Sequence, residues 1–381
     1  MLGQQINSKA FTLQSGLLLV IAMFSISILS NSSTFNYSTS ALAQPYIETV
    51  KHRDLIIDLG NGIQTNAQLT FPAIGNGPFP SVLLVPGSGA IDMNETLAPN
   101  TKPFWQISQY LSERGFAVLR YDKRGVGANS QIIDTNVWGN VTFEDLKHDA
   151  ETALNVLIQQ PEVDKNQITL IGHSEGTVIA PRIGIEQENM TNATTIKNIV
   201  LMGSAATTIA DLAYYQKVGI ALEYMHQVLD KNHTGSISLR EAIKDPLVGR
   251  FFVANFGNDS TTTVFIDIDR QIKPLLEKEL EEFTKADVNA RCDNPEGCPI
   301  WFNSAAGLEP NVNVIGNLSK STSVLMLKGE NDPLTPVQQS FLLEQRLTEV
   351  NHPDHTLITY PDLGHTFAVS PQWSTGLGPM E

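Results

Sequence analysis

A serine at the end of a predicted buried strand is the residue whose surroundings point most directly to chemistry. The apolar run Gln167–Ile171 is typical of a buried parallel strand. It leads into the pentapeptide Gly172–Gly176, which reads Gly-His-Ser-Glu-Gly, and the residues from Thr177 onward favour a helix. In a Gly-x-Ser-x-Gly between strand and helix, the glycines let the two backbones approach, and the serine hydroxyl projects from a strained turn. The pattern predicts a nucleophilic Ser174, although an ordinary turn also fits the pentapeptide alone.

A serine hydroxyl needs a base to take its proton, and that base must be oriented by a third group. Two later loops supply these groups in the expected chain order. Asp332 follows the predicted strand Ser323–Leu327, and His365 follows the predicted strand His355–Tyr360. The predicted catalytic triad is therefore Ser174, Asp332 and His365.

Two neighbouring residues are alternatives that the sequence does not favour. Glu330 lies in the same loop as Asp332, but Asp332 stands at the strand exit directly before a proline. His173 lies inside the pentapeptide, where its side chain points away from the serine that follows it. For His365 the competing interpretation is an ordinary loop histidine, because the chain has 8 histidines.

The negative oxygen of a tetrahedral intermediate needs fixed N–H donors. One is expected to be the backbone N–H of Glu175, the residue after the serine. The second is expected from the glycine-rich loop Pro86–Gly89 that follows the strand Ser81–Val85. Within that loop we expect Ser88 N–H to be the donor, and Ser88 and Glu175 form the predicted oxyanion hole.

These residues stand on an alternation of strands and helices. An antiparallel pair, Glu48–Asp58 and Ile63–Phe71, is expected first, because Asn61-Gly62 between them signals a hairpin. Further strands are predicted at 81–85, 116–122, 167–171, 198–202, 323–327 and 355–360, and helices at 104–114, 142–160, 336–350 and after 176. The fold class is α/β, a mostly parallel sheet with helices on both faces.

The alternation stops between about residues 206 and 320, where helical and irregular stretches contain no clear buried strand. An insert between two sheet strands borders the crevice at the strand ends. We therefore expect a helical cap at 206–320 that covers the substrate. Packing without a role in substrate binding is the alternative.

With these motifs the chain resembles the α/β-hydrolase superfamily, in its serine esterase and serine aminopeptidase-like group. The segments that carry the resemblance are 85–89, 119–127, 172–176, 329–332 and 364–365. The resemblance implies an α/β-hydrolase fold with a cap insert and hydrolysis through an acyl-enzyme. Members usually have a helix after the catalytic histidine, whereas residues 374–379 show no helical pattern. We therefore expect one face of the sheet to be thinly covered.

A second motif lies inside the insert, where residues 230–241 resemble a twelve-residue EF-hand loop. Gly235 would supply its sharp turn and Ile237 its apolar position, between helices expected at 221–229 and 239–252. The resemblance implies oxygen ligands from Asp230, Asn232, Thr234, the Ser236 carbonyl, Ser238 and Glu241. With only two carboxylates, the implied calcium ion is structural and weakly bound. A polar helix–helix turn is the alternative, and the sequence shows no second consensus loop.

Composition limits the partners. The net charge is −15 and 41% of the residues are hydrophobic. We see no basic cluster of the kind that nucleic acid or an anionic membrane surface requires. The only cysteines, Cys292 and Cys298, flank a turn-rich segment, which favours a small disulfide loop over two buried thiols if the chain is exported.

The first 43 residues resemble a targeting segment. Lys9 precedes the apolar stretch Leu17–Leu29, and Ala41-Leu42-Ala43 is a small-residue cleavage pattern. Thirteen apolar residues are short for a bilayer span, which needs about 20. We therefore expect residues 1–43 to be a signal peptide, residues 44–381 to be the hydrolase domain, and the protein to be secreted or at the cell surface. An uncleaved segment would instead anchor it to the membrane.

Three functions remain open from the sequence. The first is a secreted serine hydrolase that cleaves carboxylic esters, with a cap stabilised by calcium. The second is a peptidase on short peptides, in which the acidic run Glu277–Glu282 would hold the substrate amino group, although such a run is usually a solvated helix face. The third is a non-catalytic calcium-binding module on a hydrolase scaffold. No cofactor is expected for catalysis.

Overall fold

An eight-stranded sheet is the framework of the chain. The computed structural model describes residues 49–189, 194–259, 261–285, 292–373, 378 and 380–381, so the expected signal peptide at 1–43 lies outside the described residues. The strands of the sheet are β1 (Val50–Gly60), β2 (Ile63–Pro72), β3 (Phe79–Val85), β4 (Ala117–Tyr121), β7 (Val163–His173), β8 (Ile196–Met202), β11 (Ser323–Gly329) and β12 (His355–Tyr360).

The strand order is β1-β2-β4-β3-β7-β8-β11-β12. β1 and β2 form an antiparallel hairpin, β2 runs antiparallel to β4, and the strands from β4 to β12 are parallel to one another. Asn61 and Gly62 close the hairpin with φ of 53° and 77°, the positive values that a tight hairpin turn requires. All the sheet strands predicted from the sequence are confirmed.

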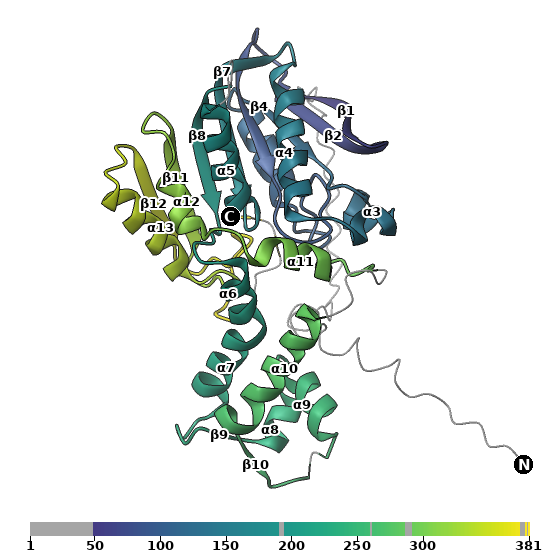
Figure 1. The fold of residues 1–381 in the computed structure, drawn as a ribbon, viewed down its shortest axis with the longest axis vertical. Helices are drawn as coiled ribbons and strands as arrows, with labels where there is room; N and C mark the ends of the chain where they lie inside the picture. Colours follow the sequence, from purple (N-terminus) through teal and green to yellow (C-terminus); the bar gives the residue numbers. More distant parts are fainter. Residues whose placement is uncertain (1–48, 190–193, 260, 286–291, 374–377, 379) are drawn as a thin grey trace, which may run out of the picture. The chain divides into compact units, whose positions relative to one another are not determined.

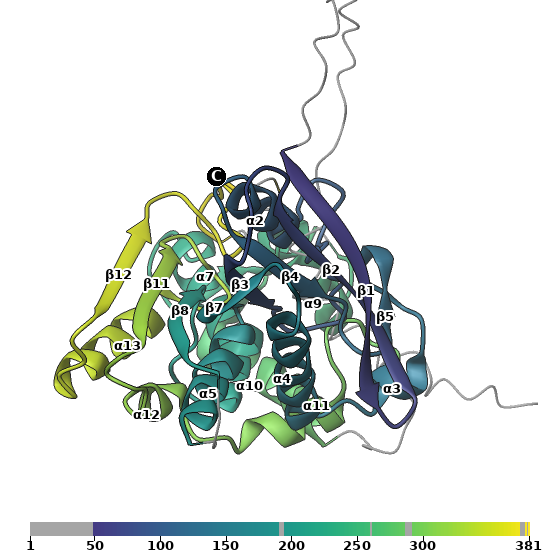
Figure 2. The same ribbon diagram turned by 90° about the horizontal axis from the view of Figure 1, so that it is seen from above.

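Helices cover both faces of this sheet (Figure 1 and Figure 2). The helices α4 (Phe143–Ile158), α5 (Gly176–Glu188) and α13 (Val337–Glu349) pack on one face, where their apolar side chains share a large core with the strands. Helix α2 (Pro103–Ser112) packs on the other face over a smaller core. The architecture is the α/β-hydrolase fold that the sequence resemblance implies.

The face under α2 also receives residues near the end of the chain. Gln106 of α2 donates to Met380 O at 3.1 Å and accepts from Met380 N at 2.7 Å, while Glu381 N donates to Phe367 O at 3.1 Å. No helix is present in the described residues after His365. Cover on this face therefore comes from α2 and from these extended contacts.

Shorter elements connect the strands. They are β5 (Val126–Gly127), β6 (Gln131–Ile132), α3 (Thr135–Gly139), α6 (Ile209–Tyr214), α11 (Pro299–Ala306) and α12 (Asn311–Ile315). Within the described part of the chain, no helix combines the length and the apolar character needed to cross a bilayer.

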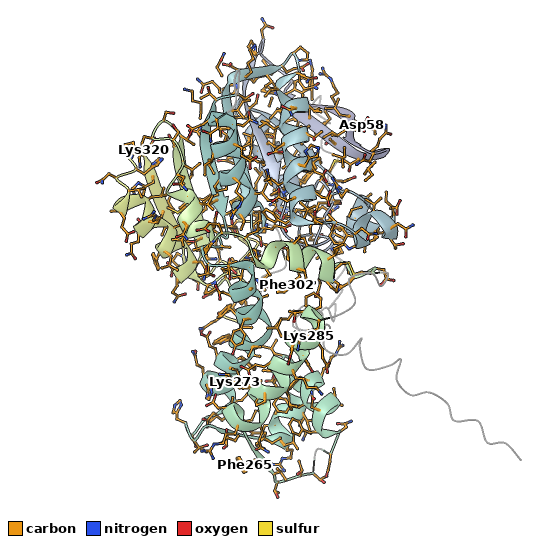
Figure 3. The ribbon with its side chains drawn as sticks, viewed as in Figure 1. Asp58, Phe265, Lys273, Lys285, Phe302 and Lys320 are labelled. Atoms are coloured by element: carbon orange, nitrogen blue, oxygen red, sulfur yellow. A yellow bond between two sulfur atoms is a disulfide. The ribbon has the colours of Figure 1, made fainter. Side chains whose placement is uncertain are left out.

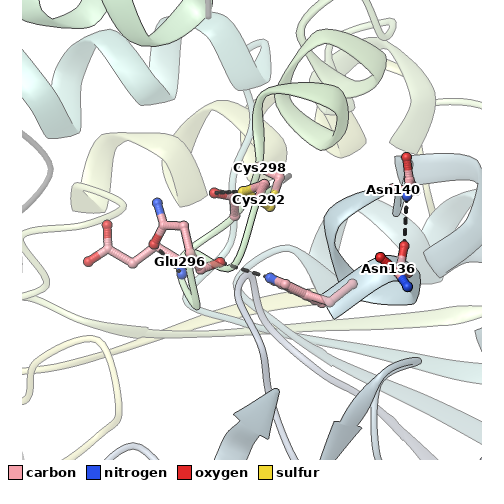
Figure 4. Close-up of a disulfide and its surroundings, with 8 residues drawn as sticks. Asn136, Asn140, Cys292, Glu296 and Cys298 are labelled. Carbon is pink, nitrogen blue, oxygen red and sulfur yellow. Dashed lines mark hydrogen bonds between the residues drawn. A yellow bond between two sulfur atoms is a disulfide. The ribbon is translucent and has the colours of Figure 1, made fainter. Parts of the chain in front are cut away.

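The predicted disulfide between Cys292 and Cys298 is confirmed, with an S–S bond of 2.02 Å (Figure 4). The loop that it closes contacts two other segments. Ala90 N donates to Pro295 O at 2.6 Å, and the indole N–H of Trp138 donates to Asn294 O at 2.8 Å. The disulfide loop thus packs against the loop that follows β3 and against α3.

Residues Tyr214–Glu282 form a compact unit of their own, apart from the unit that contains the sheet. This insert unit is narrower than the expected cap at 206–320, because α11 and α12 belong to the sheet unit. Its elements are the π-helical turns Tyr215–Gly219, Met225–Leu229 and Ile268–Ile272, the helices α7 (Ile220–Tyr224), α8 (Leu239–Lys244), α9 (Gly249–Phe256) and α10 (Lys273–Thr284), and the strands β9 (Ser236–Ser238) and β10 (Phe265–Asp267).

The strands β9 and β10 pair in antiparallel fashion and were not predicted from the sequence. Ile237 lies opposite Ile266, and both side chains are buried. The flanking Phe265, labelled in Figure 3, is 66% exposed. Three-residue strands are too short to show an alternating pattern, so no periodicity in the sequence indicates them.

The predicted start of α4 yields a stability test. Thr142 Oγ1 accepts from Asp145 N at 3.1 Å, and the Asp145 carboxylate accepts from Thr142 N at 2.9 Å, so both halves of a capping box are present. Thr142→Ala should lower the unfolding free energy by about 1 kcal/mol, because a helix N–H loses its acceptor. Thr152→Ala, a half-buried change in the middle of the same helix, is the matched control. Equal losses of melting temperature in the two variants would contradict the role of the cap.

Candidate active site

Ser174 occupies a strained turn between β7 and α5. Its φ is +52°, a left-handed conformation that is uncommon for a residue other than glycine. The two flanking glycines make the turn possible, since a Cβ on Gly172 would lie 2.2 Å from Gly176 O, and a Cβ on Gly176 would lie 2.1 Å from Val85 O. The predicted strand–turn–helix geometry is present, with its serine at the end of the strand.

Asp332 and His365 lie in direct contact. His365 Nδ1 is 2.8 Å from Asp332 Oδ2, and both side chains are buried. Glu330, the alternative acid, accepts instead from Thr359 Oγ1 at 2.7 Å in an exposed position. Of the two carboxylates in this loop, the structure places Asp332 against the histidine.

Ser174 and His365 converge at the end of β8. Ser174 N donates to Met202 O at 2.9 Å, and a Cβ on the next residue, Gly203, would lie 3.2 Å from His365 Cε1. The contacts of the described residues do not include a hydrogen bond from the Ser174 hydroxyl to His365. Such catalytic bonds often shorten only when a substrate is bound.

A buried lysine, which the sequence analysis did not single out, holds the carboxylate of Asp332. Lys328 Nζ lies 2.5 Å from Asp332 Oδ2 and donates to Thr335 Oγ1 at 2.6 Å. The Asp332 carboxylate also accepts from Leu334 N, Thr335 N and Thr335 Oγ1. Its position is therefore fixed from several sides, because each bond to a charged group is strong in a buried site.

The surroundings of His365 favour its neutral form. Burial lowers the pKa of His365 below its usual value, and the positive charges of His173 and Lys328 add to this effect, while Asp332 opposes it. Asp332 itself has a lowered pKa, because His365 and Lys328 together outweigh the effect of its burial. At neutral pH the pair is thus a carboxylate and a neutral imidazole, the state that a general base requires.

The predicted oxyanion donors lie on the two expected segments. Ser88 is exposed in the loop after β3, and Glu175 is the N-cap residue directly before α5. The neighbouring Gly87 N–H donates to Glu95 Oε1 at 3.0 Å, so it is occupied by the protein. The next N–H in the loop is that of Ser88, the donor expected from the sequence.

The side chain of Glu175 has a role that the sequence did not reveal. Its carboxylate accepts from Lys123 Nζ at 2.7 Å and from the Trp301 indole N–H at 2.6 Å, and it is buried together with Lys123. Lys123 belongs to the segment 119–127 that carries the family resemblance. The partners lie 52 and 126 residues away in the sequence, so no local pattern could have indicated them.

His173 is not positioned as the base, in agreement with the sequence analysis. One ring nitrogen, Nδ1, lies 2.9 Å from Glu95 Oε1, and the other, Nε2, lies 2.9 Å from the backbone oxygen of His365. Both nitrogens are therefore engaged by groups other than Ser174. Glu95 was not recognised from the sequence, because it lies 78 residues before His173.

A cavity of about 390 Å³ lies beside β2 and the residues that follow β4. Its lining includes the carboxylates of Asp54, Asp92 and Asp122 and contains no residue of the predicted triad. Asp92 is used within the fold, since it accepts from Thr96 N at 2.8 Å and from Asn129 N at 3.0 Å. The cavity is thus separate from the residues that could perform acyl transfer.

In the insert unit, the EF-hand-like loop is folded around Asp230. The carboxylate accepts from Thr234 N at 3.0 Å and from Gly235 N at 2.6 Å, and Gly235 has a φ of +77°. Thr234 Oγ1 lies 3.3 Å from Asp230 Oδ1 and 3.4 Å from Ser236 O. Three of the predicted ligand oxygens, on Asp230, Thr234 and Ser236, are therefore linked through the Thr234 hydroxyl.

The other predicted ligands lie around this group without completing it. Ser238 Oγ accepts from Glu241 N at 3.4 Å, while Glu241 Oε2 lies 3.5 Å from Lys231 Nζ on the surface. Asn232 is exposed. In the described residues, no group of three or more His, Cys, Asp or Glu side chains is arranged to hold a metal. A calcium ion here would depend on hydroxyl and carbonyl oxygens as much as on carboxylates.

A second loop, 259–270, is paired with loop 230–241 in matching register. Leu239 N donates to Val264 O at 3.0 Å, and Ile268 N donates to Gly235 O at 2.9 Å, so each loop donates from its tenth position to the sixth position of the other. Residues in the ninth position accept from the twelfth in both loops: Asp267 from Arg270 N at 2.8 Å, as Ser238 does from Glu241 N at 3.4 Å. The second loop escaped the sequence analysis because it has valine and arginine where an EF-hand has glycine and glutamate.

The comparisons with known proteins point to serine hydrolases. Residues 100–262 match the family model described as serine aminopeptidase, S33. Esterase EstD of Thermotoga maritima is 31% identical over 192 residues, covering 48% of this chain and 41% of EstD. Esterase FrsA of Yersinia enterocolitica is 29% identical over 159 residues, covering 42% of this chain and 33% of FrsA. The chain thus aligns with less than half the length of each of these curated relatives.

Among solved structures, the α/β hydrolase GrgF from Penicillium sp. sh18 has a TM-score of 0.49 and 16% identity. The match covers 83% of this chain and 91% of GrgF. The family match contains the turn with Ser174 but neither Asp332 nor His365, whose assignment therefore depends on the geometry alone.

The lowered pKa of His365 predicts the acidic limb of the pH profile. A base must be neutral to act, and a base with a lowered pKa stays neutral to lower pH, so the midpoint of kcat/KM should lie below the usual histidine value of about 6.5. Lys328→Met removes a cation that lowers this pKa, and the limb should move to higher pH. Lys165→Met, an exposed change, is the control. A midpoint above 6.5 that Lys328→Met leaves unchanged would contradict this electrostatic account.

Proposed function

We propose that the chain is a serine hydrolase that cleaves carboxylic esters through an acyl-enzyme. The observation that carries the proposal is Ser174, held at a φ of +52° at the same strand ends where His365 is bound to Asp332. A strained turn around a serine is expected where strain serves function. The similarity to EstD and FrsA, both named esterases, supports the same class of reaction.

In the proposed mechanism, each step uses one of these groups. His365 Nε2 takes the proton of the Ser174 hydroxyl as the oxygen attacks the ester carbonyl, and Asp332 stabilises the resulting imidazolium. The backbone N–H groups of Ser88 and Glu175 donate to the negative oxygen of the tetrahedral intermediate. His365 then gives its proton to the leaving alcohol, and a water molecule activated by the same histidine releases the acid.

The pairing of Glu175, the carboxylate next to the nucleophile, favours ester substrates over peptides. An aminopeptidase needs an unpaired acidic group to hold the substrate amino terminus. Glu175, next to the nucleophile, is already paired with Lys123 and bonded to Trp301. The acidic run Glu277–Glu282 lies in the insert unit. A short peptide remains the second candidate substrate, since the matching family is described as serine aminopeptidase.

Ser174→Ala should abolish hydrolysis of p-nitrophenyl esters while the melting temperature stays close to that of the wild type. Losses of about 10⁴-fold or more follow removal of a triad nucleophile. The wild type should also be labelled by a fluorophosphonate, and the variant should not. Ser321→Ala, an exposed change at the opposite end of the sheet, is the control.

The substrate panel should include aminoacyl anilides beside the esters. Faster turnover of anilides than of esters would favour the peptidase. If the wild type is neither labelled nor active on any substrate, the chain is a non-catalytic scaffold and the proposed hydrolase is refuted. Near-wild-type activity of Ser174→Ala would refute the assignment of the nucleophile.

We also propose that the loop 230–241 binds one structural calcium ion and that the chain is exported. Support for the ion comes from the spacing of the Asp230, Thr234 and Ser236 oxygens and from the partner loop 259–270, which pairs with it as EF-hand loops usually pair. The disulfide is consistent with export. The ion has no part in acyl transfer.

Millimolar calcium should raise the melting temperature of the wild type relative to chelator. A ligand that binds only the folded state stabilises it by about 2.7 kcal/mol at 100 times Kd. Glu241→Gln should remove most of this shift, because it weakens the expected bidentate ligand. Arg270→Gln changes the same position of the partner loop, which supplies no carboxylate there, and should preserve the shift. Identical melting curves with calcium and with chelator in the wild type would show that the loop is a capped helical turn.

A further inference from the structure

Glu95 is a buried carboxylate outside the predicted triad, in the loop that follows β3. It is 1% exposed and has a φ of +55°, an uncommon backbone conformation for a residue with a long side chain. Asp92 holds this turn, since it accepts from Asn94 N at 3.2 Å and from Thr96 N at 2.8 Å, and its backbone oxygen accepts from Glu95 N at 2.9 Å. The loop therefore directs one acidic side chain into the interior.

One oxygen of this carboxylate makes two contacts. Glu95 Oε1 accepts from Gly87 N at 3.0 Å and lies 2.9 Å from His173 Nδ1. Gly87 is tightly enclosed, because a Cβ there would lie 3.1 Å from Glu95 Oε1 and 3.2 Å from Ser174 Cβ. Glu95 thus contacts both the oxyanion loop, which is the glycine-rich loop Pro86–Gly89, and the residue that precedes the nucleophile.

The second contact of His173 determines where its protons lie. His173 Nε2 is 2.9 Å from the backbone oxygen of His365. A carbonyl oxygen only accepts, so Nε2 must carry a proton. The remaining proton lies between Nδ1 and Glu95 Oε1. The pair of an imidazolium on His173 and a carboxylate on Glu95 is favoured. Burial alone would raise the pKa of Glu95, but the charge and the hydrogen bond of His173 lower it.

From these contacts we infer that Glu95 and His173 form a positioning pair that holds three parts of the active site together. The parts are the oxyanion loop at Gly87, the turn with Ser174, and the loop with His365. The inference rests on the proposed serine-hydrolase function. Neither residue touches the substrate: Glu95 fixes the loop that presents Ser88 N–H, and His173 fixes the backbone of the general base.

The pair also acts on the charge of the base. The rings of His173 and His365 have centroids 4.8 Å apart. The charged groups that act on His365 are Asp332, Lys328 and His173, and His173 is itself paired with Glu95. The His173 cation lowers the pKa of His365. Loss of that cation should therefore raise the pKa of the base, an effect that packing alone would not produce.

Two variants separate the contacts of the pair. In Glu95→Gln the amide oxygen still accepts from Gly87 N–H but no longer carries the charge that holds the second proton on His173. In His173→Asn the cation and the bond to the His365 backbone are both removed. Glu349→Gln, an exposed change on α13, is the matched control. The full chain is assayed for p-nitrophenyl ester turnover across pH, for the rate of fluorophosphonate labelling and for melting temperature.

Each variant should lower kcat by about 10- to 100-fold with little change in KM, because misplaced groups act in the transition state. His173→Asn should also move the acidic limb of kcat/KM to higher pH. The double variant should lose little more than the worse single variant, since the two residues act as a unit. A uniform loss at all pH values that follows the melting temperature would show a merely structural role and overturn the inference.

Wild-type kinetics in both variants would also overturn the inference of a positioning pair. The labelling experiment separates this result from a failure of the proposed function. A wild type that is not labelled at Ser174 refutes the hydrolase, and the positioning role with it. A wild type that is labelled, with variants labelled at the same rate, refutes the positioning pair alone.

Discussion

Buried charge at the carboxyl ends of the strands is the constraint on which the site depends. Removing an ion from water costs several kcal/mol even in real proteins, and the cost is recovered only where a partner and further hydrogen bonds are in place. Three such pairs surround the strand ends: Lys123–Glu175, Lys328–Asp332 and Glu95–His173. The first and third pairs join segments that are 52 and 78 residues apart, and Lys328–Asp332 joins strand β11 to the loop that follows it, so satisfying the charges also fixes the loops. The polar groups of the site are therefore held in place before a substrate arrives.

The sequence predicted the parts of this site that are local, and it could not predict the pairs that join them. Ser174 was found because strand, glycine and helix patterns are contiguous, and Asp332 and His365 were found because each follows a strand. The structure brings the last two together. Glu95 and Lys123 carry no local signal, since their partners lie 78 and 52 residues away. Propensity and periodicity describe neighbours along the chain, whereas ion pairs depend on the completed fold.

In the insert, too, a local sequence motif could be recognised, whereas contacts between distant segments could not. Loop 230–241 was recognised because its glycine and terminal glutamate follow a known spacing, and its partner loop 259–270 was missed because both are replaced. Only the pairing of β9 with β10 shows that the two loops correspond. The compact unit Tyr214–Glu282 is only a part of the expected insert, because residues beyond Glu282 pack with the sheet unit. A pattern of helices and irregular segments does not reveal to which core each helix belongs.

The charges around His365 determine how much transition-state stabilisation the base can provide and how much the oxyanion donors must provide. Lys328 draws on the same carboxylate oxygen of Asp332 that His365 contacts, so less of that negative charge is available to stabilise an imidazolium. The positive charge of His173 also opposes the imidazolium. The base is thus available over a wide pH range but is weak. A weak base leaves more of the transition-state stabilisation to the oxyanion donors, whose effect is usually the largest single one. Under the proposed mechanism the N–H groups of the loop after β3 have to stay fixed, and a buried carboxylate and the disulfide loop both hold this loop.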